Sequence, residues 1–193
     1  MKKKIININK KNDINNFYHL LWLYKIIYRR RELVIKYHTK ISKDKKKEFE
    51  EIIHAFNIKD KNERLEYVYF TMVDNVNADL QKNNYCEFDE NGTCIFNRAK
   101  HTKWKSCCRK CPYLGEHGCT ENNFACKYFF CYYIRTHKKI PNYSRIRLFR
   151  YYLTPTQKFI CTDNFWTPTK EILFYLKNNH FLSYITHAKK FNE

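Results

Sequence analysis

The residues with the clearest chemical potential are cysteines, and eight of them lie between Cys86 and Cys131. Thiolates are soft ligands, and four of them around one centre bind zinc or an iron–sulfur cluster well. We therefore predict that this segment, the cysteine block, binds metal. The candidate ligands are Cys86, Cys94, Cys107, Cys108, Cys111, Cys119, Cys126 and Cys131, with His101 and His117 as possible additional ligands.

The number of thiols favours zinc, because two four-cysteine sites would use all eight without remainder. We therefore expect one or two zinc ions. The two-residue spacing between Cys108 and Cys111 is that of a zinc knuckle. An iron–sulfur cluster is the alternative, since adjacent cysteines such as Cys107 and Cys108 also occur around clusters. Spacing alone does not assign thiols to a shared metal.

The block is interpreted as a structural site, because such sites use four protein ligands and leave no open position for a substrate. Catalytic motifs are lacking elsewhere: there is no HExxH and no GxSxG, and three glycines cannot build a phosphate loop. The chain therefore fits a binding protein better than an enzyme. The ninth cysteine, Cys161, follows the apolar residues KFI and is interpreted as a small buried side chain.

The charge of the chain points to an anionic partner. There are 37 Lys and Arg against 19 Asp and Glu, a formal net charge of +18. Such a field attracts nucleic acid or anionic membrane surfaces. Residues 128–152 alternate cations with aromatic rings that can stack on bases. The possible nucleic-acid contacts there are Arg135, Lys138, Lys139, Arg145, Arg147, Arg150 and Tyr132.

The sequence indicates a cytoplasmic protein with reduced thiols. Its longest apolar run, 17–28, is shorter than the ~20 residues that span a bilayer, and it contains Lys25. The basic start lacks the continuous apolar segment of a signal peptide. Nine cysteines, an odd number, also do not fit a closed disulfide framework.

Three functional hypotheses follow. The first is a metal-binding module, with structural zinc, that contacts nucleic acid or a nucleoprotein partner. The second is an iron–sulfur protein with a redox or enzymatic role. The third is a small mobile-element or phage-type inhibitor of a host nucleoprotein machine, which small size and high charge favour.

Apolar residues recur at spacings of three and four before the cysteine block, and this pattern predicts helices. The expected helices cover 14–39, from Ser42 or Asp44 to about 56, and from Asp60 to about 80. Within the block, Asn91-Gly92 predicts the turn of a hairpin over 86–96. Two short loops are expected over 107–120.

After residue 123 the pattern is helical again. We expect helices over 124–137 and 143–153, the second with Ile146, Phe149 and Leu153 inward and its three arginines outward. Thr154-Pro155 and Thr167-Pro168 each combine a cap with proline at the first helical position, which predicts two further helix starts.

The predicted fold is mainly α: a helical domain with an inserted, irregular cysteine-rich metal knuckle that contains a short β-hairpin. Residues 1–84 form an N-terminal helical region and 85–131 the knuckle. Residues 132–193 form a C-terminal helical region that packs with the N-terminal helices as one compact domain.

Three segments, CEFDENGTCIFNR, CCRKCPYLGEHGCT and ACKYFFC, resemble a family of uncharacterised cysteine-rich proteins of clostridia and related bacteria. The likeness covers roughly the last two-thirds of the chain. It implies metal ligation by the block's cysteines other than Cys107, and it implies no activity. More loosely, 107–131 is similar to the cysteine clusters of the YkgJ-like metal-chelating proteins, although the tyrosine and Arg-Pro spacing expected there is missing.

Overall fold

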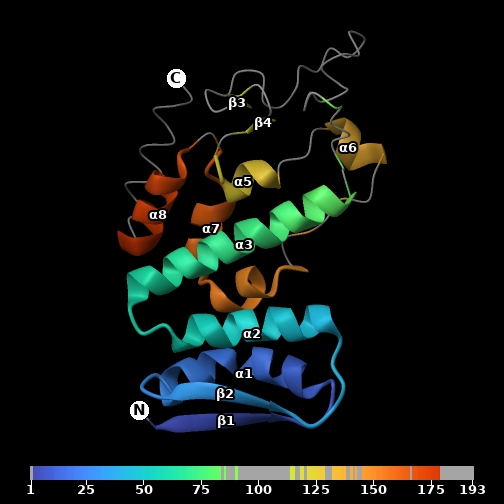
Figure 1. Ribbon diagram of the computed structural model, residues 1–193. Helices are drawn as coiled ribbons and strands as arrows, with labels where there is room; N and C mark the ends of the chain where they lie inside the picture. The colour runs from blue at the N-terminus through green and yellow to red at the C-terminus, as the bar shows by residue number, and fades with distance from the viewer. Residues whose placement is uncertain are drawn as a thin grey trace.

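The computed structural model describes residues 2–83, 85, 90, 114–115, 118–119, 121–128, 132–137, 140, 142, 145–165 and 167–178. This part of the chain is mainly helical, as predicted, with two small two-stranded sheets. Figure 1 shows the first sheet at one end, the helices α1, α2 and α3 stacked above it, and the later helices behind α3. Apart from Glu90, the hairpin predicted over 86–96 lies outside the described residues.

The chain begins with a β–α–β unit. Strand β1 (Lys3–Ile8) pairs in parallel with β2 (Glu32–Tyr37), so that Ile6 lies opposite Ile35. Helix α1 (Asp13–Ile27) forms the crossover that parallel pairing requires. Ile6 and Ile8 are buried, whereas Ile5 and Asn7 are exposed, the alternation of a strand with one face on the core.

The prediction of one helix over 14–39 is therefore wrong in its second half. Tyr28 follows α1, and the Arg31 amide donates to the Tyr28 carbonyl (2.8 Å) to turn the chain. The following residues, ELVIKY, are rich in β-branched and apolar types that favour strands. Their pairing with β1 outweighs the helical spacing. The residues before α1 supply the other strand, β1.

The helices α2 (Lys43–Asn57) and α3 (Lys61–Asn83) confirm their predictions. Asp60 lies just before α3, and its Oδ1 accepts from the amides of Asn62 (2.9 Å) and Glu63 (2.8 Å). These bonds satisfy amides that the first turn of a helix leaves unpaired. The apolar side chains that form the predicted stripes are buried, with one exception: Leu80 is only partly buried against the core. The buried members are Phe49, Ile52, Ile53 and Phe56 in α2 and Leu65, Val68, Tyr69, Met72, Val73 and Val76 in α3.

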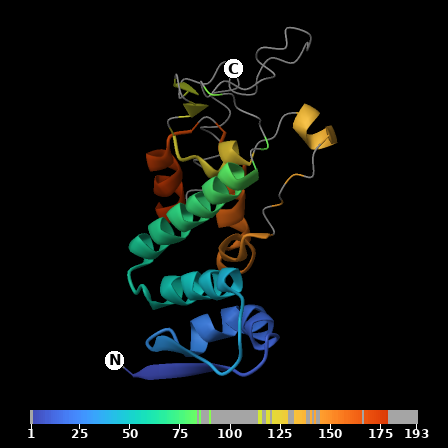
Figure 2. The same ribbon diagram turned by 45° about the vertical axis from the view of Figure 1, so that its right-hand side comes forward.

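The C-terminal helices share a core with the first three. The π-helical turn η2 (Leu148–Tyr152) contacts α1, α2 and α3, and α8 (Thr169–Asn178) packs on α3 and α7 (Pro155–Thr162). One hydrophobic cluster runs from Ile6 to Leu176. Figure 2 shows η2 (orange) between α2 and the later helices, so it packs between the N-terminal and C-terminal parts of the helical core. Ile172, Leu173 and Leu176 are buried as predicted.

Two of the later helix predictions are corrected. Residues 124–137 hold two separate helices, α5 (Phe124–Lys127) and α6 (Tyr132–His137), and Tyr128 forms the C-cap of α5. Within 143–153 the described residues are not one continuous α-helix: the chain is irregular at Ile146, and the π-helical turn η2 follows, whose Leu148 and Tyr152 are more deeply buried than the predicted Ile146 and Phe149. Leu153 is buried as predicted.

A small antiparallel ladder lies within 107–120, where loops were expected. Leu114 of β3 (Leu114–Gly115) pairs with Cys119 of β4 (Gly118–Cys119), and Gly115 pairs with Gly118. The two strands are two residues apart in sequence, the separation of a tight hairpin.

Helix α7 begins with the capping box that its sequence predicts. Thr154 Oγ1 accepts from the Gln157 amide (3.3 Å), and Gln157 Oε1 accepts from the Thr154 amide (3.0 Å). We expect Thr154→Ala to lower the free energy of unfolding by about 1 kcal/mol, because the Gln157 amide loses its side-chain acceptor. Thr154→Ser retains the hydroxyl, so we expect its free energy of unfolding, measured in urea, to fall by less than half as much as that of Thr154→Ala. Equal losses from both variants would contradict a capping role.

Candidate metal centre and basic surface

Two of the ten predicted metal-ligand candidates fall within the described residues. Cys119 lies in β4 and Cys126 in α5. The other candidates lie outside them: Cys86, Cys94, Cys107, Cys108, Cys111, Cys131, His101 and His117. Across the described part of the chain, no group of three or more His, Cys, Asp or Glu residues is placed to hold a metal ion. Metal binding by the block therefore stays a prediction.

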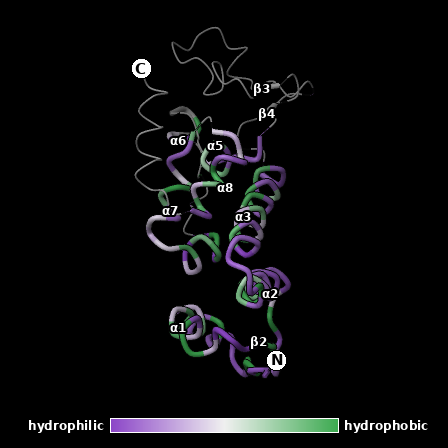
Figure 3. The backbone as a smooth tube through the Cα atoms, turned by 90° about the vertical axis from the view of Figure 1, so that its left-hand side faces the viewer, coloured by the Kyte–Doolittle hydropathy of each residue, from purple (hydrophilic) through white to green (hydrophobic). Residues whose placement is uncertain are grey.

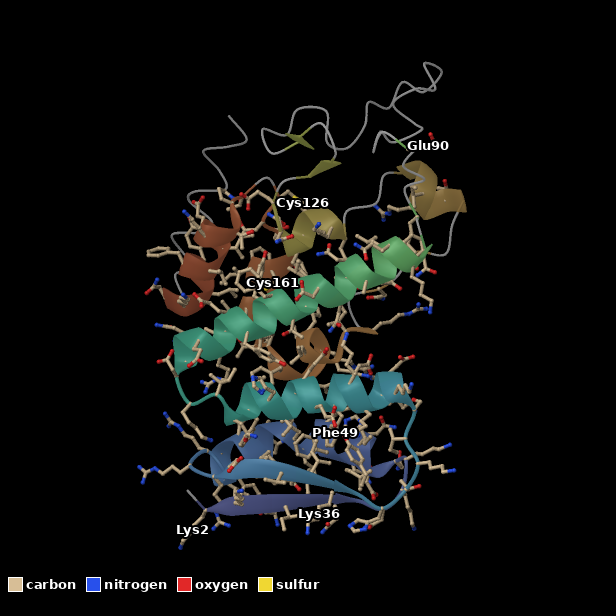
Figure 4. The ribbon with its side chains drawn as sticks, viewed as in Figure 1. Lys2, Lys36, Phe49, Glu90, Cys126 and Cys161 are labelled. Carbon is tan, nitrogen blue, oxygen red and sulfur yellow. The ribbon has the colours of Figure 1, made fainter. Side chains whose placement is uncertain are left out.

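Cys126, a predicted metal ligand, and Cys161, a predicted core residue, differ in how deeply their side chains are buried. The Cys161 side chain is fully buried, and burial raises the pKa of its thiol. This confirms its interpretation as a small core residue, because a buried neutral thiol is inert. The Cys126 side chain is half-buried. Figure 4 shows it on α5, at the end of the helical body towards β3 and β4, whereas Cys161 lies deeper.

A buried polar joint fixes the chain just before Cys126. Asn123 is 1% exposed, and its side chain makes three hydrogen bonds. Its Nδ2 donates to the carbonyls of Asn164 (2.6 Å) and Thr167 (2.9 Å), and its Oδ1 accepts from the Cys126 amide (3.0 Å). One asparagine thus caps α5 and ties it to the loop between α7 and α8.

Tyr69 and Glu121 extend this joint to α3 and α8. The Tyr69 hydroxyl donates to the Asn122 carbonyl (3.1 Å) and accepts from the Phe124 amide (3.2 Å). Burial raises the pKa of Tyr69, so its hydroxyl keeps the proton that it donates. Glu121 Oε2 accepts from both the amide and the hydroxyl of Thr169 (3.0 Å each), where a carboxylate suits the positive end of α8.

Sequence reasoning named Tyr69 only as a core residue and missed Asn123, Glu121 and Asn164. A signal for Asn123 was present, since an asparagine directly before an apolar helical segment is typical of an N-cap. Its long-range partners, 41 and 44 residues away, were not readable from local pattern. The joint fixes the position of α5, which carries Cys126, relative to α3, α7 and α8.

The arginines predicted to contact nucleic acid differ in exposure and in whether a carboxylate already pairs with their charge. Arg135, Arg145 and Arg150 are exposed. Arg147 was expected to point outward, but it is half-buried: its Nε is 3.6 Å from Glu48 Oε2, and its guanidinium lies over the Tyr18 ring (5.7 Å). That residue is a poorer candidate because its charge is already paired. Lys138 and Lys139 lie outside the described residues, and of Tyr132 only the backbone, in α6, is described.

Two lysines missed at sequence level lie beside this surface. Lys158 Nζ donates to the Arg150 carbonyl (2.8 Å). Lys25 Nζ donates to the Tyr152 carbonyl (2.8 Å) and lies 3.6 Å from the centre of the Tyr152 ring. Burial, together with the nearby charges of Arg64 and Lys158, lowers the pKa of Lys25 to about 8. A carbonyl and a ring thus hold a cation that is partly removed from water.

Lys25 makes the stability of the protein depend on pH. An unfolded lysine has a pKa of about 10.5, so between pH 8 and 10.5 the unfolded chain binds a proton that the folded chain has lost. The free energy of unfolding therefore rises with pH, by roughly 2 kcal/mol between pH 7 and 10. Lys25→Met should lack this rise.

The measurement is urea unfolding of both proteins at several pH values up to 10. Tyrosines with raised pKa values act in the opposite direction above pH 10, and they contribute equally to the two proteins. A constant difference between wild type and Lys25→Met across this range would show that Lys25 keeps an ordinary pKa.

No described helix is both long and apolar enough to cross a membrane. Comparison of the chain with protein-family models, with curated proteins and with solved structures finds no match.

Proposed function

We propose that this chain is a metal-binding protein in which structural zinc folds the cysteine block and a basic surface contacts nucleic acid or a nucleoprotein partner. The observation that carries the proposal is the buried joint at Asn123. It supports the proposal because it fixes Cys126, a half-buried thiol of the block, on a packed helical scaffold. A rigid scaffold lowers the conformational entropy that metal ligation must overcome.

The donor set also fits this metal. Eight thiols in one short segment supply the soft anionic ligands that zinc prefers, and the segment is poor in aliphatic residues that would otherwise form a core. When bound, zinc would cross-link the cysteines. The chain's own contribution is the anchoring of the block's end by Asn123 and Tyr69.

The first test is elemental analysis of protein purified without oxygen, together with its absorption spectrum. We expect one or two zinc ions per chain and no visible absorption. Iron with visible absorption would replace this proposal by the iron–sulfur alternative. Protein without bound metal that also fails to bind added zinc would refute both.

The nucleic-acid part rests on Arg145 and Arg150. Both are exposed, and Lys158 lies next to the Arg150 backbone, whereas Arg147 is paired with Glu48. Binding of labelled DNA and RNA is measured by fluorescence anisotropy at several salt concentrations. Arg145→Gln/Arg150→Gln should weaken binding and reduce the salt slope by about 2.

The matched control is Lys43→Gln/Lys45→Gln, which removes two exposed charges at the start of α2. Equal weakening by both double variants would mean that only net charge matters. Absence of binding to any nucleic acid at low salt would exclude this part of the proposal and leave the metal part intact.

A further inference from the structure

From Leu20 onward, helix α1 is apolar on nearly every side although it lies at the surface, whereas its first half exposes Asn15, Asn16 and His19. Its inner side is in the core. The Phe17 ring packs edge to face on the Phe49 ring of α2, with 5.1 Å between the ring centroids, and the Tyr18 ring stacks on the Tyr151 ring, with 5.0 Å between the centroids. Its outer side exposes large apolar side chains. These are Leu20 (44% exposed), Trp22 (62%), Ile26 (68%) and Ile27 (56%).

These four residues, the α1 patch, form a single outward face. At 100° per residue they spread around the direction opposite to the buried side chains, with half-buried Leu23 between them. Figure 3 shows α1 at one edge, with the sheet and α2 on its inner side and no described element on its outer side. A helix that is apolar all round is normally covered on all sides, but no described residue covers this face.

The charges around the patch are all of one sign. From Ile14 to Arg31 the chain carries no carboxylate; its cations are three arginines and Lys25, and Lys25 lies on the inner side against Tyr152. The arginines, Arg29 to Arg31, are exposed and follow the patch directly; Lys59 Nζ donates to the Arg31 carbonyl (2.8 Å). The next carboxylate, Glu32, is 4.0 Å from Lys3.

We propose that the α1 patch is a docking surface for an anionic lipid bilayer. Indole and aliphatic side chains partition into the boundary between headgroups and acyl chains, and adjacent arginines bind lipid phosphates. The helix has 15 residues and lies flat against the sheet, so it rests in the interface and does not span it.

Two other occupants fit less well. A second copy of this chain would place two arginine triplets close together in a two-fold pairing, and each copy carries a formal charge of +18. Nucleic acid matches the charge, but isoleucine and leucine side chains offer no flat face on which bases stack. An anionic membrane satisfies both the charge and the aliphatic surface.

The test is co-sedimentation of the whole metal-loaded protein with phosphatidylcholine vesicles that contain or lack phosphatidylserine. We expect binding to the anionic vesicles only, and weakening of about tenfold in Trp22→Ser/Ile26→Ser. The matched control Phe70→Ser/Phe174→Ser removes two exposed apolar residues from α3 and α8 and should bind as wild type does. Arg29→Gln/Arg30→Gln should weaken binding to anionic vesicles by a similar factor.

A second readout detects insertion directly. Trp104→Phe/Trp166→Phe leaves Trp22 as the only tryptophan of three, and its emission should shift to shorter wavelength on anionic vesicles. Circular dichroism confirms that each variant is folded. Equal binding by the patch variant and the control, or no shift of the Trp22 emission, overturns the proposal. So does a wild-type dimer that the patch variant converts to a monomer, because a second copy then covers the face.

Discussion

Replacing Asn123 by alanine is expected to lower the free energy of unfolding by roughly 2–4 kcal/mol. The side chain is almost fully buried and makes three hydrogen bonds to backbone groups. Alanine would leave the carbonyls of Asn164 and Thr167 and the amide of Cys126 without these partners. Buried groups left unpaired carry the full cost of desolvation.

The variant Asn123→Asp separates the contribution of the oxygen that caps the Cys126 amide from that of the two N–H donors. Aspartate keeps an oxygen that caps the Cys126 amide, but it replaces the two N–H donors by a second acceptor facing two carbonyls. A buried carboxylate next to carbonyl oxygens is unfavourable, so we expect a loss at least as large as that of Asn123→Ala. If the cap alone mattered, Asn123→Asp would be nearly as stable as wild type.

The measurement is urea unfolding followed by circular dichroism. The control is Asn178→Ala, which removes an exposed asparagine whose Nδ2 donates to the Phe174 carbonyl (2.9 Å) at the end of α8. We expect it to change stability by less than about 0.5 kcal/mol. Similar losses for Asn123→Ala and Asn178→Ala would show that the joint does not stabilise the fold.

The sequence predicted those elements whose signals are local. The capping box at Thr154 and the apolar stripes of α2 and α3 depend on residues three or four positions apart, and the structure confirms them. The strands β1 and β2 depend instead on a partner about 29 residues away, because parallel pairing joins Lys3 to Glu32. A helical spacing that continued past Ile27 therefore suggested helix where long-range pairing forms a strand.

The same distinction applies to the candidate site. The cysteines and arginines could be selected by residue type, but their surroundings could not. Whether an arginine is free to bind a phosphate depends on a distant residue, as Glu48 shows for Arg147. The position of Cys126 likewise depends on Asn123, whose partners come from the loop after α7. Residue type predicted the possible chemistry, and tertiary contacts decide which side chains are available for it.

Replacing Cys126 by serine is expected to weaken zinc binding by roughly 100-fold or more, whereas Cys161→Ala should leave zinc affinity unchanged. Serine is nearly isosteric with cysteine, but its hydroxyl does not ionise near neutral pH and is a poor zinc ligand. Cys161 is fully buried within α7, so its truncation should instead lower the free energy of unfolding by about 1 kcal/mol.

The pair of variants tests whether metal binding and core packing use different thiols. Zinc affinity is measured by competition with a chromophoric chelator, and stability by urea unfolding of the metal-loaded proteins. If Cys126→Ser retains wild-type zinc affinity, Cys126 is not a ligand, and the joint at Asn123 then serves only to pack α5. If Cys161→Ala loses zinc, the buried thiol lies in a metal site and its interpretation as a core residue is wrong. Loss of zinc by Cys126→Ser alone would establish that the helical core holds one end of the metal site through Asn123.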